Sequence, residues 1–219
     1  MRVSYDREGR RVEERGAVER LKRGDVGGLE TLVRAHQTRA LRAAYLIVRD
    51  RALAEDVVQE VFLRAYEKIG RFDETRPFGP WFTKIVVNDA IKAASRREQI
   101  ARFGQKGGED AVSRLVDPGT SPQGLAEEAE ERRRVWAALE KLPPAQRATV
   151  VQRYYLGLNE AEMAGMGGSP VGTIKWRLHA ARMSLSKLLR PEVREATVRR
   201  ERSGPFGASD ALEGGSNRD

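Results

Sequence analysis

The spacing of apolar side chains limits this chain to helices arranged in two blocks. Apolar residues recur every three or four positions over residues 25–97 and again over residues 135–189, as on the buried face of a helix. Between them, residues 104–131 hold few large apolar side chains and two runs rich in glycine and proline, GQKGGED and DPGTSPQG. Such a segment cannot bury a core of its own. We therefore predict an all-α protein of two small helical domains joined by a flexible acidic linker.

Start and stop signals divide the first block into three predicted helices, over residues 25–48, 53–69 and 81–97. Residues 1–20 alternate Arg and Glu with few apolar anchors, so we expect a loose or weakly helical extension there. The stretch GRFDETRPFGP at residues 70–80 holds two prolines and two glycines and must be a loop. The first block therefore predicts one compact helical domain.

The second block contains a sharp turn at residues 142–144, followed by predicted helices over residues 145–156, 159–164 and 170–189. The last helix begins with Ser169, which suits the N-cap, and a proline at the first helical position. The predicted boundaries are an N-terminal extension 1–22, a first domain 23–98, a linker 99–131, a second domain 132–190 and a disordered tail 191–219.

Charge is distributed unevenly along the chain. The chain has 40 Lys and Arg against 32 Asp and Glu, a net charge of +8 and a pI near 10.0. A basic surplus suggests a polyanionic partner, nucleic acid first and an anionic membrane second. Residues 104–131 reverse the balance, with seven acidic side chains and two basic ones. The predicted linker is therefore acidic within a basic protein.

Several classes of function are excluded by what the sequence lacks. It has no cysteine, which rules out disulfides, thiolate nucleophiles and zinc sites with cysteine ligands. His36 and His179 are far apart and have no accompanying ligands. We find no phosphate-binding glycine loop, no carboxylates at metal spacing in a loop and no nucleophile–base pair. We therefore expect neither an enzyme nor a bound metal or cofactor.

The sequence contains no segment typical of secretion or of membrane insertion. The N-terminal stretch MRVSYDREGR lacks the apolar core of a secretory signal. The longest strongly apolar run, residues 43–48, is too short to span a bilayer. We expect a cytoplasmic protein with no membrane insertion.

The strongest functional signal lies at the end of the second block. A short helix from Asn159, a glycine-containing turn at residues 165–168 and a long helix from Pro170 form the pattern of a helix-turn-helix. Residues 170–190 carry five basic side chains and no acidic one. The side chains off the apolar stripe that would face base edges are Thr173, Lys175, Trp176, Arg177 and His179. The alternative is an amphipathic helix whose basic face is only solvated.

Trp176 has the least expected position on this helix. It lies two residues from both Ile174 and Leu178 of the apolar stripe, and two residues correspond to about 200° around a helix. The indole should therefore point away from the core. Three uses stay open: contact with the DNA groove, docking on the first domain or an inhibitor, and folding back over Tyr154 or Tyr155.

In the first block, Lys84, Asn88 and Lys92 are four residues apart and share one face of the third predicted helix, which Arg96 extends. Asparagine can hydrogen-bond a base edge and lysine can neutralise phosphate. A solvated lysine face is an equal alternative.

The loop before this helix, together with the start of the helix, carries Phe72, Phe78 and Trp81. Aromatic surfaces near basic residues suit unstacked single-stranded bases. The alternative is that all three rings belong to the core, which we favour for Trp81.

The polar face of the second predicted helix is of another kind. It presents Asp56, Gln59, Glu60, Leu63 and Arg64. Acidic residues beside an outward leucine suit a protein partner better than DNA, although a solvated face is the default.

Taken in order and spacing, these segments resemble the extracytoplasmic-function sigma factors of bacteria. AEDVVQEVFLRAY at 54–66 is similar to the polymerase-binding helix of the family's region two, and PWFTKIVVNDAIKAASRR at 80–97 to its helix for the minus-ten element. LEKLPPAQRATVVQRYYLGLNEAEMA at 139–164, followed by PVGTIKWRLHAARMSLSKLL at 170–189, is similar to region four. The resemblance implies a non-enzymatic subunit that binds core RNA polymerase and directs promoter-specific initiation.

The resemblance also implies residue roles. It implies that core polymerase is contacted by Asp56, Gln59, Glu60, Leu63 and Arg64. It implies that the minus-ten element is bound by Arg71, Phe72, Asp73, Phe78, Lys84, Asn88, Lys92 and Arg96. The loop would capture a flipped base. It implies that the minus-thirty-five element is bound by Thr173, Lys175, Trp176, Arg177, His179 and Arg182. The acidic linker would thread toward the RNA exit path. Many members of the family are held by an anti-sigma protein, which makes such an inhibitor a candidate partner.

The chain departs from the family pattern in three places. Trp176 stands where the family has a small residue, Lys92 stands where it has an acidic or amide residue, and EMAGMGGSP is rich in glycine. These departures concern DNA sequence preference and not the class. The alternative, a helix-turn-helix regulator that binds duplex DNA without polymerase, would explain only the second domain.

Overall fold

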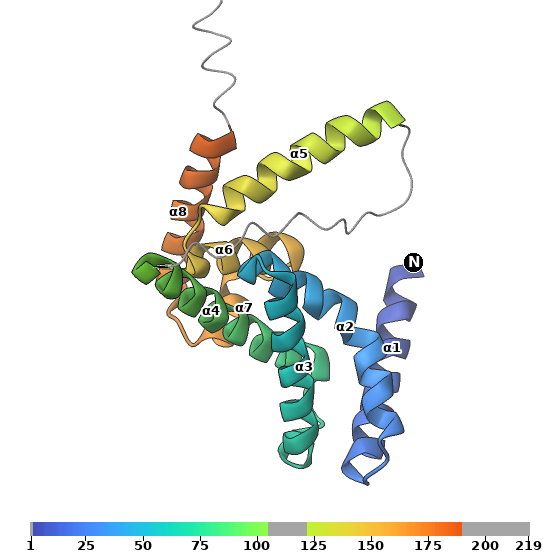
Figure 1. Cartoon of the computed structure of the whole chain (residues 1–219). Coiled ribbons are helices and arrows are strands. Elements are labelled where there is room, and N and C mark those ends of the chain that lie inside the picture. The colour runs from blue at the N-terminus through green and yellow to red at the C-terminus, as the bar shows by residue number, and fades with distance from the viewer. Residues whose placement is uncertain (1, 105–121, 190–219) are drawn as a thin grey trace, which may run out of the picture.

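The computed structural model describes residues 2–104 and 122–189, and these residues are helical with no strand (Figure 1). The elements are α1 (Arg2–Lys22), α2 (Gly27–Val48), α3 (Arg51–Lys68), the 3-10 turn η1 (Ile69–Arg71), α4 (Phe78–Gly104), α5 (Pro122–Glu140), α6 (Pro144–Val150), the π-helical turn η2 (Val151–Tyr155), α7 (Glu160–Gly167) and α8 (Val171–Leu189). The predicted all-α class is confirmed.

Helices α1 to α4 pack together as the first domain, with α2 in contact with the other three. The expected loose or weakly helical extension is not loose in its described part, because α1 is a helix whose Ala17, Val18 and Leu21 are buried. Two small residues permit the close approach of α1 and α2: a Cβ atom at Gly28 would collide with the backbone carbonyl of Ala17. Among the described side chains of α1, these three apolar residues stand in a highly charged sequence, which is why the contact was not apparent from the sequence.

Local hydrogen bonds set the sharp turn between α2 and α3. Arg49 ends α2 in the left-handed conformation, with φ of 63°, and its N–H donates to the Tyr45 carbonyl. Asp50 then caps α3 by accepting a hydrogen bond from the Leu53 N–H at 3.0 Å. With one residue ending α2 and the next capping α3, the two helices fold back on each other without a loop.

The predicted linker is shorter than its composition indicated. Helix α4 continues to Gly104 and α5 begins at Pro122, so both helices extend into the segment 99–131. Glu130 pairs with Arg133 at 2.5 Å and with Arg134 at 3.5 Å, at the spacing that supports a helix. Residues 105–121 lie outside the described part of the chain, so the flexibility of the linker stays a prediction, as does the disorder of residues 191–219.

The helix-turn-helix of the second domain is formed by α7 and α8. Asn159 and Glu162 make reciprocal hydrogen bonds that cap α7, at 2.8 and 2.9 Å. Gly168 follows α7 in the left-handed conformation. The predicted start of α8 is one residue early, because the Pro170 carbonyl accepts the first helical hydrogen bonds, and Ser169 Oγ instead accepts from Arg177 at 3.5 Å.

The two domains pack against each other, which the sequence did not indicate. The buried core of the first domain includes three residues of the second: Ala148 of α6, Val151 of η2 and Leu156, which follows η2. The separate core of the second domain is small and contains Leu139, Leu142, Val150 and Ala181. The second domain therefore completes its burial on the first.

Candidate DNA and polymerase interfaces

The predicted minus-ten side chains of α4 differ in how they are engaged. Lys84 Nζ donates to the Gly165 carbonyl at 3.0 Å, and Asn88 Nδ2 donates to the Met166 carbonyl at 3.4 Å. Both acceptors belong to the last turn of α7 in the second domain. One turn further along α4, Lys92 is exposed and pairs with Asp89 at 3.3 Å. The end of α7 therefore accepts hydrogen bonds from the first two residues, of which Asn88 is half-buried and Lys84 is exposed, and Lys92 and Arg96 are also exposed.

The loop before α4 turns its aromatic rings inward. Phe72 is 7% and Phe78 is 3% exposed, and both rings contact Trp81, which is half-buried. The core alternative therefore describes Phe72 and Phe78, whose faces are not available for stacking in this conformation. The pattern of the loop could not separate the two possibilities, because a stiff aromatic loop suits either.

The outer side of the same loop is polar. Arg71 and Asp73 are exposed. The hydroxyl and the N–H of Thr75 donate to the Asp73 carboxylate at 2.6 and 3.0 Å, and these hydrogen bonds lower the pKa of Asp73. Asp73 is therefore held as an anion that fixes the turn of the loop.

Lys22, at the end of α1, contacts this loop. The sequence did not predict a role for it. Its Nζ donates to the Phe72 carbonyl at 2.8 Å and pairs with Glu74 at 2.7 Å. These contacts join residues about 50 positions apart in sequence. A lysine among the many charges of α1 carries no signal of such a contact.

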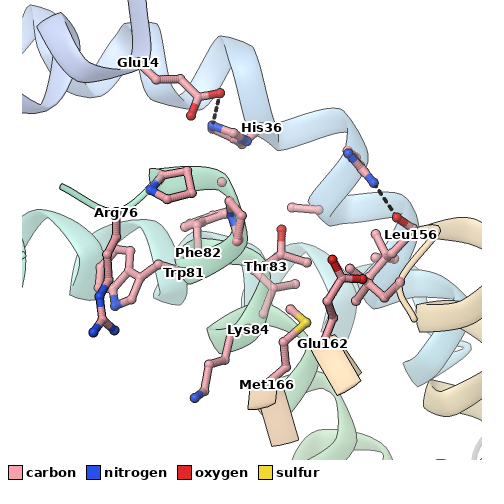
Figure 2. A pocket seen from close by; sticks show the side chains of 18 of the residues that line it. Glu14, His36, Arg76, Trp81, Phe82, Thr83, Lys84, Leu156, Glu162 and Met166 are labelled. Atoms are coloured by element: carbon pink, nitrogen blue, oxygen red, sulfur yellow. Dashed lines mark hydrogen bonds and ion pairs between the residues drawn. The ribbon is translucent and has the colours of Figure 1, made fainter. Parts of the chain in front are cut away.

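A cleft of about 1130 Å³ opens between the two domains beside the loop. Figure 2 shows Lys84 beside Met166 on its wall, with Trp81 and Phe82 nearby. His36 pairs with Glu14 of α1 at 3.3 Å above the loop, and Arg39 Nη2 donates to the Leu156 carbonyl at 2.9 Å. The cleft is thus lined by α1, α2, α4 and the second domain together.

The predicted polymerase face of α3 is largely open. Asp56, Gln59 and Glu60 are exposed, and Leu63 is 58% exposed. Arg64 is different: it pairs with Glu60 at 3.5 Å and with Asp89, so its guanidinium turns toward α4. Tyr66, 42% exposed, adds to the apolar surface around Leu63 and was not among the predicted residues.

The predicted minus-thirty-five face of α8 is accessible to solvent. Ile174, Leu178 and Ala181 are buried. The predicted reading residues lie off this stripe: Lys175, Trp176, His179 and Arg182 are exposed, and Thr173 and Arg177 are half-buried. The amphipathic arrangement predicted from the sequence is therefore present.

Trp176 is 63% exposed, and among the described residues no ring contact joins it to another aromatic side chain. It does not fold back over Tyr154. That tyrosine instead accepts a hydrogen bond from Arg182 Nε at 2.9 Å. The outward orientation expected from helix geometry is therefore found.

Comparison with known proteins decides the family. Residues 32–100 match the Sigma-70 region 2 family and residues 132–185 match the Sigma-70, region 4 family. The RNA polymerase sigma-H factor of Pseudomonas aeruginosa is 31% identical over 189 residues, covering 82% of this chain and 95% of the relative. The chain belongs to the extracytoplasmic-function (ECF) sigma factors.

Other relatives agree with this family. The ECF RNA polymerase sigma factor SigW of Bacillus subtilis is 28% identical over 177 residues, covering 79% of this chain and 95% of that protein. Among solved structures, CnrH in complex with the cytosolic domain of CnrY has a TM-score of 0.56 and 25% identity, covering 81% of this chain and 97% of that one. The sigma factor RpoE of Bartonella quintana, in complex with the anti-sigma factor NepR, has a TM-score of 0.58 at 20% identity, covering 74% and 96%, and shows the fold alone.

This sigma factor directs promoter-specific transcription, with core RNA polymerase and promoter DNA as its partners. The stand-alone regulator receives no support from the comparisons. Among the described residues, no helix is long and apolar enough to cross a membrane, and no group of His, Asp or Glu is placed to hold a metal ion. The relatives are non-enzymatic transcription factors.

Proposed function

We propose that this sigma factor divides promoter recognition between its two domains. The exposed side of α8 reads the minus-thirty-five element, and α4 with the preceding loop reads the minus-ten element. The observation that carries the proposal is the division of α8, where Ile174 and Leu178 are buried while Lys175 and Arg182 are exposed on a helix whose described residues include no acid. A helix of this kind fits the major groove with its positive side chains free for DNA.

For the minus-ten element we propose Lys84, Asn88, Lys92 and Arg96 of α4, with Arg71 and Asp73 on the outer side of the loop. The buried positions of Phe72 and Phe78 favour a scaffolding role: their rings hold the loop in shape rather than stacking on bases. The half-buried Trp81 forms the base of this scaffold.

For core polymerase we propose the exposed face of α3, made by Asp56, Gln59, Glu60 and Leu63. An exposed leucine surrounded by acids is typical of a protein interface, since it gives an apolar centre with a charged rim. Arg64 acts indirectly, because its ion pair with Asp89 links this face to α4.

The protein works in the cytoplasm, where polymerase is found, without catalysis and without a metal or cofactor. An anti-sigma factor is a further expected partner, since the related RpoE structure contains the anti-sigma factor NepR.

Reconstitution with core RNA polymerase tests the proposal. Start sites mapped after overexpression supply the promoters, and each face is then changed separately. Asp56→Lys with Glu60→Lys should remove co-purification with core polymerase while leaving the melting temperature unchanged, because both side chains are exposed. Lys175→Ala should lower initiation only at promoters that depend on the minus-thirty-five element. Unchanged initiation in both variants would refute the assignment of the faces.

A further inference from the structure

Helix α1 contacts the minus-ten loop (residues 72–77, between η1 and α4) where the loop begins. Lys22, the last residue of α1, donates from Nζ to the Phe72 carbonyl at 2.8 Å and pairs with Glu74 at 2.7 Å. The Lys22 and Glu74 side chains are 24% and 32% exposed, so water screens this ion pair less than it would screen one on the open surface. The carboxyl end of α1 therefore fixes the first residues of the loop.

The loop is also held where it ends, by His36 of α2 and Glu14 of α1. The His36 ring lies 5.5 Å from the ring of Phe78, which follows the loop and begins α4. A Cβ atom at the next residue, Gly79, would lie only 3.0 Å from His36 Cε1, so the absence of a side chain there permits this close approach. His36 Nε2 lies 3.3 Å from Glu14 Oε1, and both side chains are largely buried (Figure 2). Glu14 thus reaches the end of the loop through His36.

Between these two contacts the loop stands away from α1. A cleft of about 230 Å³ separates them, and its walls include Val18 of α1 and Phe72 and Pro77 of the loop. Glu14 and Lys22 are eight positions apart, which corresponds to about 12 Å of helix. Because α1 is a rigid helix packed on α2, it fixes the distance between the two ends of the loop.

We propose that α1 is a positioning helix for minus-ten recognition. Lys22 holds the start of the loop, and Glu14 holds its end through His36. Together they fix the direction of the exposed side chains of Asp73 in the loop and Arg71 just before it. A loop that is already fixed does not lose its freedom again when it binds a base, so its contacts discriminate better between bases. Helix α1 lies outside both segments that match the family, and this inference rests on the proposed role of the loop.

A variant that releases both ends of the loop tests the proposal. Lys22→Met with Glu14→Gln removes one basic and one acidic group from α1 and keeps both side chains close to their original size. The matched control is Arg34→Met with Glu30→Gln, which removes the same charges from an exposed pair of α2. Each protein is assembled with core RNA polymerase. Initiation is then measured on a promoter found by start-site mapping and on versions of it with one minus-ten base changed.

The ratio of initiation on the original promoter to initiation on each changed version measures discrimination at that base. Arg71→Ala and Asp73→Ala identify the bases that the loop reads. At those bases, we expect the α1 variant to lower the ratio about tenfold, within the range that one base contact contributes. The control pair should leave every ratio unchanged. Lys22→Arg should also keep the wild-type ratios, because arginine retains a charged donor at this position.

The conformation of the loop is followed separately by fluorescence of the free chain. The chain has three tryptophans, and replacing Trp136 and Trp176 with phenylalanine leaves Trp81 as the reporter. Its ring centroid lies 4.9 Å from that of Phe72 and 5.4 Å from that of Phe78. We expect acrylamide to quench Trp81 more strongly in the α1 variant than in the wild type or the control.

The outcomes distinguish this inference from the function on which it rests. If the α1 variant keeps the wild-type ratios while Arg71→Ala or Asp73→Ala changes them, the loop reads DNA but α1 does not position it. If the ratios fall and quenching of Trp81 stays the same, α1 acts on DNA without moving the loop, and the inference is overturned. If neither the loop variants nor the α1 variant changes any ratio, the proposed role of the loop fails, and this inference fails with it.

Discussion

Helices α4 and α8 carry similar polar stripes but present them differently. Each has lysine and other hydrogen-bonding side chains on the side away from its apolar stripe. On α8 that side faces solvent, with Lys175 and Trp176 exposed, while on α4 Lys84 and Asn88 donate hydrogen bonds to the end of α7. A basic stripe in a sequence therefore shows what a helix can bind, whereas packing decides whether it is free to bind.

The difference arises from the number of faces that each helix buries. Helix α8 packs on α5, α6 and α7 within the second domain, and Lys175 and Trp176 on its other side are exposed. Helix α4 packs on α2 and α3 and also contacts α6 and α7. A helix between two domains therefore shares some polar side chains with the second domain, although Lys84, Lys92 and Arg96 of α4 keep exposed surface.

Removal of the ion pair between the domains should have the largest effect. Arg147→Met is expected to lower the free energy of unfolding by about 2–3 kcal/mol, because a charged hydrogen bond is lost in a buried setting. Urea denaturation measures it. Arg34→Met removes one partner of an exposed pair and should cost less than about 0.5 kcal/mol. Equal losses would mean that Arg147 does not hold α4 against the second domain.

The two stripes should also differ in binding of duplex DNA by the free chain. Lys175→Ala with Arg182→Ala should weaken non-specific binding about thirtyfold, because about 1 kcal/mol is lost at each exposed cation. Lys84→Ala should leave it unchanged, since Lys84 is engaged by α7. Anisotropy titrations at several salt concentrations test this. A weakening by Lys84→Ala as large as that of the α8 variant would show that the hydrogen bond to Gly165 does not keep Lys84 from DNA.

Lys22 offers a smaller change on the α4 side. Lys22→Met keeps the aliphatic stem but loses the contacts with Phe72 and Glu74, and should reduce initiation about fivefold, which corresponds to about 1 kcal/mol for one part-buried contact. Core polymerase binding should not change, and Lys22→Arg should restore activity. If Lys22→Arg were as defective as Lys22→Met, charge at the loop would not explain the loss.

Trp176 should show the smallest effect on stability. Because its indole is largely exposed and makes no ring contact within the described residues, Trp176→Ser should change the free energy of unfolding by less than about 0.5 kcal/mol. Preference among minus-thirty-five sequences should shift, as expected for a base-reading side chain. A clear fall in melting temperature with promoter preference intact would instead assign Trp176 a structural role.

Much of the helical architecture followed from the sequence alone. Periodic apolar residues predicted α2, α3 and α4, and the asparagine and glycines around α7 predicted the helix-turn-helix. The outward direction of Trp176 followed from its distance to Ile174 and Leu178. These features could be predicted because each depends on residues within a few positions of one another, where helix geometry fixes direction.

Three features were decided only by the tertiary structure. The charged sequence of α1 did not predict its packing, which is visible only in the close contact between Gly28 of α2 and Ala17 of α1. From the sequence, Phe72 and Phe78 could face either a base or the core. Their packing against Trp81 shows that they face the core. The hydrogen bonds of Lys84 and Asn88 to α7 could not be predicted because their acceptors are backbone carbonyls. Every residue has a carbonyl, so a sequence contains no mark of which ones a distant side chain will bind.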